Sequence, residues 1–237
     1  MTNNSMNKYL EETLLLNFHS KNIQELISIH KWEALPDKEK IYTVYNFIRD
    51  EIRFGYNADD ALPASEILSE GYGHCNTKGI LFMALLRAIG IPCRIHGFTI
   101  HKELQKGIIT GIWYKLAPEE IIHSWVEVYY KGKWLNIEGF ILDLEYIKKL
   151  QIKFKNCDGA FCGFGVGTKK FKNPDIYWNE NDTYIQKEAV KKDFGVFDDP
   201  DSFFPAHRQK LNLIKKFIYQ NLTRHLMNWK VNKIRNF

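Results

Sequence analysis

The sequence predicts an α+β fold in which helices come first and an antiparallel sheet follows. Apolar residues recur at helical spacing up to residue 89, and segments that suit strands follow between residues 93 and 142. A length of 237 residues with 45% hydrophobic and 14% aromatic residues suits one large domain with a sizeable core. The same composition excludes a disordered, collagen-like or coiled-coil chain.

The helices are expected at residues 8–32 with a break near Ser20, 36–54, 64–68 and 75–89. Segment 36–54 has one apolar and one charged face, so it should cover the core from outside. Segment 75–89 is apolar on nearly every face, which is typical of a helix in the centre of a domain. Gly90 and Pro92 end it.

The strands are expected at residues 93–100, 108–114, 124–130 and 134–142. The tight turn Lys131-Gly132 joins the last two as a hairpin. Beyond them, residues 155–167 form a glycine-rich loop and residues 173–205 show no regular pattern. We therefore expect a core with N-terminal helices over residues 1–150 and a C-terminal extension, residues 151–237, packed on the same domain.

The end of the chain is strongly basic. Eight of the 33 basic residues and no acid lie between Ser202 and Phe237, whereas the preceding 201 residues hold 25 bases and 28 acids. Residues 207–229 regain helical spacing, with an apolar stripe at Leu211, Ile214, Phe217, Ile218, Leu222 and Leu226. We expect this helix to dock on the domain through the stripe, and we favour that over nucleic-acid or membrane binding.

Three short motifs predict chemistry: G-x-C at residues 73–75, H-x-W-x-E-V at 123–128 and G-x-W-x-x-x-E at 132–138. A thiol in the first turn of a helix lies at the positive end of the helix dipole, which stabilises the thiolate. Gly71 and Gly73 leave room beside it for a substrate backbone. Cys75 is therefore the candidate nucleophile.

The hairpin brings a histidine and an acid together. If Tyr130 lies opposite Lys133, His123 and Glu138 become diagonal neighbours on one face, shared with Trp125. A helix N-terminus packed against that face would place Cys75 beside His123, with Glu138 orienting the imidazole. Nucleophile, base and orienting acid would then be in contact.

These residues resemble the transglutaminase-like cysteine enzymes of the papain-like superfamily. That family has a G-x-C motif, a helix ending in A-L-L-R-x-x-G-I-P-x-R, an H-x-W-x-E-V strand and a G-x-W with an acid four residues after the tryptophan. Here these are residues 73–75, 84–94, 123–128 and 132–138. The motifs span about residues 64–143, and the resemblance implies a papain-like core with a Cys75–His123–Glu138 triad.

One position departs from the family pattern, because the third member is usually aspartate and Glu138 is longer by one methylene. Asp143 is the nearest substitute should Glu138 not reach the imidazole. The resemblance also implies oxyanion donors from the Cys75 amide and from an upstream side chain, for which Tyr56 and Asn57 are the candidates. Trp125 is expected to wall the site.

The resemblance implies amide or thioester chemistry through a covalent acyl-enzyme, with a peptide, protein or small amide or thioester as substrate. Release by water would make the chain a peptidase or deamidase, which we prefer. Release by an amine would make it a transglutaminase-type acyltransferase. The alternative is a catalytically silent binding module with a basic tail.

No cofactor or metal is expected. Cys157 and Cys162 could form a labile disulfide or bind metal, but without a second cysteine pair or a nearby histidine they are a weak zinc signal, and a glycine-rich lid is an equal alternative. The N-terminus lacks the apolar core of a secretory signal, so we expect a cytoplasmic protein.

Overall fold

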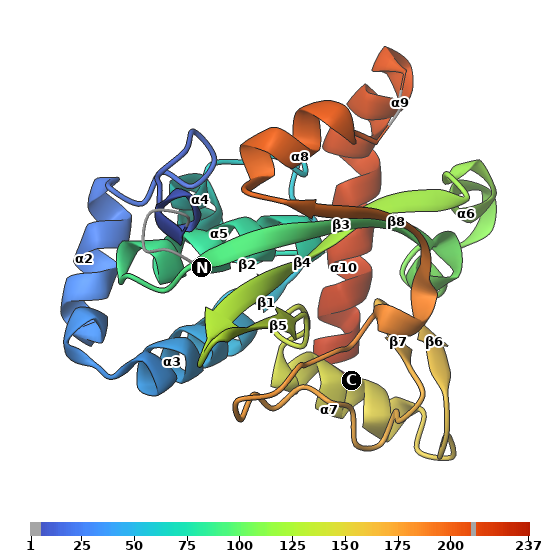
Figure 1. The fold of residues 1–237 in the computed structure, drawn as a ribbon. Helices are drawn as coiled ribbons and strands as arrows, with labels where there is room; N and C mark the ends of the chain where they lie inside the picture. The colour runs from blue at the N-terminus through green and yellow to red at the C-terminus, as the bar shows by residue number, and fades with distance from the viewer. Residues whose placement is uncertain (1–5, 210–211) are drawn as a thin grey trace.

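The computed structural model describes residues 6–209 and 212–237 and has an α+β fold (Figure 1). Its main sheet has four antiparallel strands in the order β5-β4-β3-β8. Their bounds are β3 Cys93–His101, β4 Glu120–Tyr130, β5 Lys133–Ile137 and β8 Val190–Phe197. Two small sheets pair β1 (Arg53–Phe54) with β2 (Tyr72–Gly73) and β6 (Phe161–Gly163) with β7 (Val166–Thr168).

The α-helices are α2 (Lys21–His30), α3 (Asp37–Asp50), α4 (Ala64–Glu70), α5 (Cys75–Ala88), α6 (Gly111–Leu116), α7 (Leu144–Lys153), α8 (Pro200–Ala206), α9 (Leu213–Ile218) and α10 (Arg224–Arg235). A π-helical turn, η5 (Tyr219–Thr223), joins α9 to α10. Short 3-10 turns are η1 (Asn7–Tyr9), η2 (Trp32–Ala34), η3 (Lys102–Gln105) and η4 (Lys187–Ala189). None of the described helices is long and apolar enough to cross a membrane.

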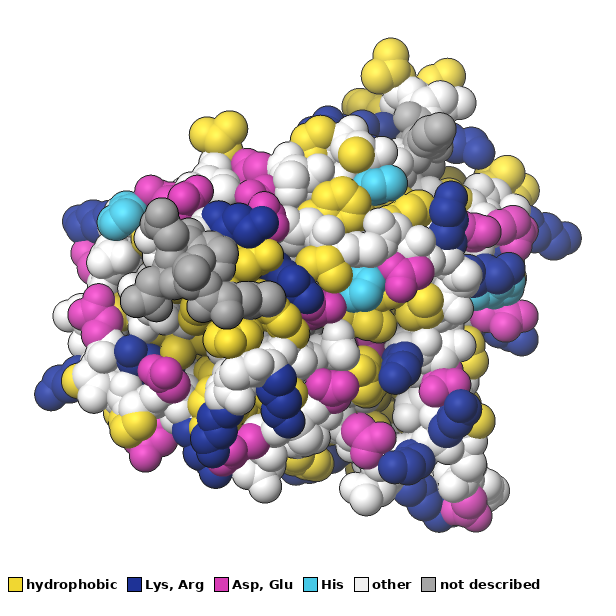
Figure 2. Space-filling model, in the orientation of Figure 1, with side chains coloured by type: hydrophobic (Ala, Val, Ile, Leu, Met, Phe, Trp, Pro, Cys, Tyr) yellow, Lys and Arg dark blue, Asp and Glu magenta, His cyan; other side chains and the backbone are white. Residues whose placement is uncertain are grey.

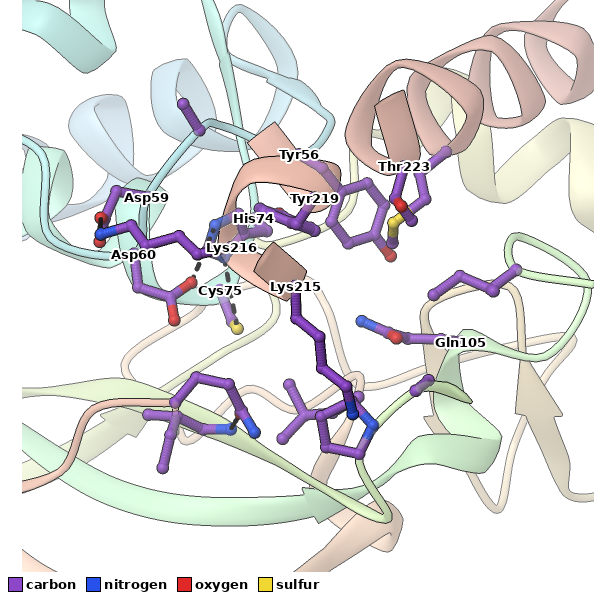
Figure 3. Close-up of a pocket in the computed structure, with 18 of the residues that line it drawn as sticks. Tyr56, Asp59, Asp60, His74, Cys75, Gln105, Lys215, Lys216, Tyr219 and Thr223 are labelled. Atoms are coloured by element: carbon purple, nitrogen blue, oxygen red, sulfur yellow. Dashed lines mark hydrogen bonds and ion pairs between the residues drawn. The ribbon is translucent and has the colours of Figure 1, made fainter. Parts of the chain in front are cut away.

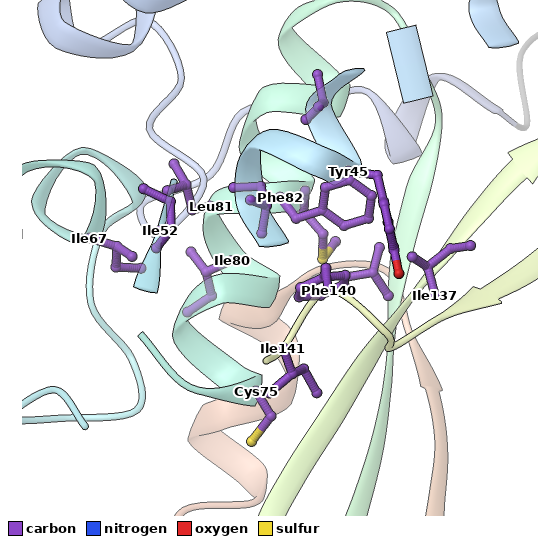
Figure 4. Packing of buried hydrophobic residues seen from close by; sticks show 14 of the residues in the cluster. Tyr45, Ile52, Ile67, Cys75, Ile80, Leu81, Phe82, Ile137, Phe140 and Ile141 are labelled. Atoms are coloured by element: carbon purple, nitrogen blue, oxygen red, sulfur yellow. The ribbon is translucent and has the colours of Figure 1, made fainter. Parts of the chain in front are cut away.

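Helix α5 lies in the centre of the molecule, as predicted, and every residue from Cys75 to Arg87 is buried. Its apolar side chains, Phe82 among them, pack with Tyr45 of α3 and Phe140, while Cys75 lies at the end of the helix (Figure 4). One hydrophobic core extends from Leu16 to Ile234. The first residue of α5 therefore begins a helix that the core surrounds.

Two predicted elements are wrong. Residues 10–20 are not helical, because the backbone and Thr13 there bond to the Asp201 carboxylate instead. Residues 108–114 do not form a strand: Gly107 and Gly111 have φ of +91° and +62°, and the chain turns there into α6. The fourth strand is β8, which falls in the segment without a regular pattern.

The predicted register of the hairpin is confirmed from Tyr130↔Lys133 to Val126↔Ile137. Strand β5 ends at Ile137, earlier than expected, because the N–H of Glu138 donates to the Thr183 carbonyl (3.0 Å). Helix α5 packs on the opposite face to the predicted one, since Ser124 donates to Asn76 (2.9 Å) and Val126 lies beside Gly79.

Most of the apolar stripe of the basic C-terminal segment does not dock on the domain, although Ile218 lines a cavity. Ile214 and Phe217 are 71% and 67% exposed, and hydrophobic side chains project at the tip of α9 (Figure 2). The helix docks instead through Met227, Val231 and Ile234 on its other face. Leu211 lies outside the described residues.

Candidate active site

The local backbone places Cys75 at the start of α5. The N–H of His74, the residue before the helix, donates to the Thr77 hydroxyl (3.0 Å), which fixes the first turn. A Cβ at position 73 would lie 2.7 Å from that hydroxyl oxygen, so the G-x-C glycine is required by close packing. The thiol is 8% exposed and opens into a cavity.

His123 and Glu138 form a fully buried pair. The Nε2 atom of His123 lies 2.9 Å from Oε1 of Glu138, and both side chains are 0% exposed. The other carboxylate oxygen accepts three backbone N–H groups, from Ile185 (2.9 Å), Gln186 (3.0 Å) and Lys187 (3.1 Å). Glu138 is long enough to orient the imidazole and is itself held by the segment 185–187.

Asp143 has a different position. It begins α7, where its carboxylate accepts the N–H of Tyr146 (2.9 Å), and it also pairs with Arg235. It is therefore committed to the link between α7 and α10, and Glu138 is the acid beside His123.

The electrostatics favour a thiolate–imidazolium pair. Burial raises the pKa of the Cys75 thiol, but His123 and, to a smaller extent, His74 outweigh it and bring that pKa to about 6. Burial lowers the pKa of His123, but the Cys75 sulfur and Glu138 raise it to about 10. The Nδ1 atom of His123 is buried without a hydrogen-bond partner among the described residues, which leaves it available to the thiol.

The other buried thiol behaves differently. Burial raises the pKa of Cys93 to about 11, and its sulfur faces the Met83 carbonyl in the core. The four cysteines are free, so Cys157 and Cys162 are not bridged. Residues 6–209 and 212–237 contain no cluster of three or more His, Cys, Asp or Glu side chains arranged for a metal.

The cavity above Cys75 has a volume of about 280 Å³ (Figure 3). Most of its wall is apolar and comes from Ile100, Leu104, Ile109, Trp113, Leu116, Ile121, Ile122, Phe204, Ile218 and Met227. Its polar side holds His74, Asp59 and Asp60. The C-terminal helices form one wall, tied down by Lys216 to Asp59 (2.9 Å) and by the Tyr219 hydroxyl, which donates to the Asn57 carbonyl (3.1 Å).

Of the three residues expected to assist or wall the site, Tyr56 alone lines this cavity. Burial, with a smaller effect of nearby Tyr146 and Cys75, holds the pKa of Tyr56 well above 10, so its hydroxyl remains a donor. Asn57 is fully buried and its amide donates to Glu70 (2.6 Å) and to the Tyr72 carbonyl (3.0 Å). Trp125 packs on Phe98, with ring centroids 4.0 Å apart, away from the cavity.

Two further residues of the cavity wall, His74 and Asp60, were not predicted from the sequence. Nδ1 of His74 lies 3.8 Å from the Cys75 sulfur, and its Nε2 lies 3.4 Å from Oδ1 of Asp60 (Figure 3). The adjacency of His74 to Cys75 was visible in the sequence, but the contact with Asp60 depends on how the loop before α4 folds. Two imidazoles, each with a carboxylate, thus flank one sulfur.

Comparison with known proteins identifies a family match within the first part of the chain. Residues 30–139 match the core of the family described as the transglutaminase-like superfamily. Its members are typically cysteine enzymes. A search of curated proteins finds no match.

Two solved structures resemble the fold. One is a candidate cysteine protease from Cytophaga hutchinsonii, with a TM-score of 0.48 and 12% identity over 85% of this chain and 50% of that one. The other is red sea bream transglutaminase, with a TM-score of 0.31 and 14% identity over 55% of this chain and 25% of that one. The chain therefore spans about half the length of the first protein and a quarter of the second.

Proposed function

We propose that the chain is a cysteine hydrolase or acyltransferase that acts through a covalent acyl-enzyme on Cys75. The proposal rests on the thiol at a helix N-terminus, its electrostatic interaction with His123 and the buried His123–Glu138 contact. Cys75 and His123 belong to the transglutaminase-like core, while the acid is glutamate in place of aspartate.

The chemistry follows from these positions. The thiolate attacks an amide or thioester carbonyl carbon, and the Cys75 N–H and the Tyr56 hydroxyl are the proposed donors to the oxyanion. The His123 imidazolium gives its proton to the leaving group as the C–N or C–S bond of the substrate breaks. Water or an amine then attacks the thioester, and we prefer water, which makes the chain a peptidase or deamidase.

The cavity supports an apolar acyl group as the part of the substrate held over the thiol. Its apolar wall surrounds a volume of about 280 Å³, enough for a short acyl chain or an aromatic side chain. The polar side at Asp59 and Asp60 would face the leaving group or the incoming nucleophile. The substrate would be a peptide, a protein or a small amide or thioester with such a group.

One observation favours the alternative of a catalytically silent binding module. Cys75 is only 8% exposed, and the helices α9 and α10 with η5 contribute to the wall that covers it. A module of this kind would retain the fold without a reactive thiol.

Alkylation with limiting iodoacetamide, mapped by mass spectrometry across pH, separates these two functions. Labelling of Cys75 should fall as the pH drops through about 6, where the thiolate takes up a proton, and should stay level above it, well below the ordinary thiol pKa of about 8.5. Cys162, whose residue is exposed, is the internal control. It should react only at higher pH, because partial burial of its thiol and the nearby Glu103 raise its pKa.

The variant His123→Ala should move Cys75 labelling to the ordinary thiol range. Labelling of Cys75 no faster than Cys162 at pH 7 would contradict the enzyme function and favour the silent module.

A further inference from the structure

We propose that His74, oriented by Asp60, is a second catalytic base that activates the water or amine attacking the acyl-enzyme. The inference rests on the proposed function and divides its two proton transfers between two histidines. His123 would serve the thiol and the leaving group, and His74 would serve the incoming nucleophile.

Accessibility distinguishes the two rings. His123 is 0% exposed, does not line the cavity and has its Nε2 engaged with Glu138. His74 lines the cavity beside the sulfur. A nucleophile that enters through the cavity therefore meets the His74 ring, whereas His123 is buried and forms no part of the cavity wall.

The contacts of His74 define which nitrogen can accept a proton. Nε2 lies 3.4 Å from Oδ1 of Asp60, an electrostatic contact without hydrogen-bond geometry among the described residues. Asp60 in turn lies next to Asp59, which is paired with Lys216 of α9. A neutral ring with its proton on Nε2 leaves Nδ1 as an acceptor, 3.8 Å from the sulfur that would carry the acyl group. The Tyr56 ring lies roughly parallel to the His74 ring, with centroids 6.1 Å apart.

Hydrolysis of the acyl-enzyme moves one proton from the attacking water to His74. Water oxygen bonds to the thioester carbonyl carbon while one water proton moves to Nδ1 of His74, and the C–S bond breaks to give a carboxylic acid and the Cys75 thiolate. The acid ionises into solvent, and the proton on His74 passes by way of the adjacent sulfur to His123. With an amine as nucleophile, the product is an amide and the protons follow the same route.

The charges around His74 change during this cycle in a favourable direction. Burial lowers its pKa, but the hydrogen bond with Cys75 and the charges of Asp60 and the sulfur raise it above 6.5, against a smaller opposing effect of His123. Acylation removes the negative charge from the sulfur, and this lowers the pKa of His74. The His74 ring is then more readily neutral at the step in which a base is needed.

The test uses the full chain with 4-nitrophenyl hexanoate, whose burst of nitrophenol reports acylation and whose steady-state rate reports deacylation. The variant His74→Asn retains a residue favoured at a helix N-terminus, so α5 should still form. Because His74 also helps to lower the pKa of Cys75, the two proteins are compared at about pH 9, where the thiol is largely ionised in both. We expect a burst of unchanged amplitude, a steady-state rate about 100-fold lower and an accumulated acyl-enzyme visible by intact mass. Asp60→Asn should lower the steady-state rate by a smaller factor, about tenfold, and shift the lower limb of its pH profile.

Iodoacetamide provides the matched control, since iodide leaves without a proton and alkylation needs no second base. At the same pH, Cys75 alkylation in His74→Asn should stay within about threefold of the wild-type rate, because His123 still favours the thiolate. Hydroxylamine, a stronger nucleophile than water, should restore turnover. A steady-state rate within twofold of wild type would overturn the role of His74, as would a parallel tenfold loss of alkylation and burst. Absence of a burst in the wild-type chain would instead overturn the proposed acyl transfer itself.

Discussion

Two regions of the molecule contribute to the candidate site in different ways. The region from Phe54 to Glu138 carries the nucleophile, both histidines and the acid. The region from Thr183 to Arg235 holds them in place, through N–H groups that bind Glu138 and helices that wall the cavity. The first region contributes through side chains, and the second mainly through backbone groups and packing. This difference determines how much of each region's role could be predicted from the sequence.

The first way to test this comparison is to alter the contact where the two regions meet. Glu138→Gln keeps the size of the side chain but turns its contact with His123 from carboxylate into amide, which favours the wrong tautomer of the imidazole. We expect kcat/KM for 4-nitrophenyl hexanoate to fall about 10³-fold. The pKa of Cys75 from the alkylation profile should rise, because His123 loses a group that favours its charged form.

Glu127→Gln is the matched control for this change. Glu127 lies on the same strand as His123 but pairs with Arg94 and His96 outside the cavity. It should leave kcat/KM within about twofold of wild type. An equal loss of kcat/KM in both variants would indicate that Glu138, like Glu127, contributes only to the fold.

The side-chain contacts of the first region could be predicted because hairpin geometry is regular. Pairing Tyr130 with Lys133 predicted that His123 and Glu138 would be diagonal neighbours, and their contact is present although β5 ends one residue before Glu138. Residues 75–89 predicted α5 because they are apolar on nearly every face, which is typical of a central helix. Local sequence patterns were therefore enough for these two elements.

The second region could not be predicted because its role depends on groups that every residue carries. The N–H donors of Ile185, Gln186 and Lys187 have no side-chain signature. Strand β8 lies at the edge of the sheet and is largely exposed, so its sequence lacks the alternation that marks a half-buried strand. The apolar stripe of the C-terminal segment suggested the wrong docking face, since the docked face is narrower and partly polar.

A second test asks whether the later region stabilises the core as one cooperative unit. Arg235 of α10 is buried against Asp143 and also donates to the Phe54 carbonyl (2.9 Å), two residues before Tyr56. Arg235→Met should lower the free energy of unfolding in urea by about 3–5 kcal/mol, because it leaves Asp143 buried without its main partner. Lys216→Ala breaks an exposed pair with Asp59 and should cost less than about 1 kcal/mol. A small loss for Arg235→Met would show that the helix is held by its apolar face alone.

The smallest expected effect is on the chain-length preference set by the cavity wall, to which both regions contribute side chains. Each methylene added to the acyl group of a 4-nitrophenyl ester buries apolar surface worth about 0.8 kcal/mol, so kcat/KM should rise about fourfold per carbon from acetate to hexanoate, until the cavity of about 280 Å³ is full. Leu104→Ala enlarges the cavity on the side of the first region, and Met227→Ala enlarges it on the side of α10. In both variants kcat/KM should therefore continue to rise for acyl chains longer than hexanoate. If Leu104→Ala alone extends it, the C-terminal helix does not contact the acyl group, and its part in the site is limited to supporting the residues beneath it.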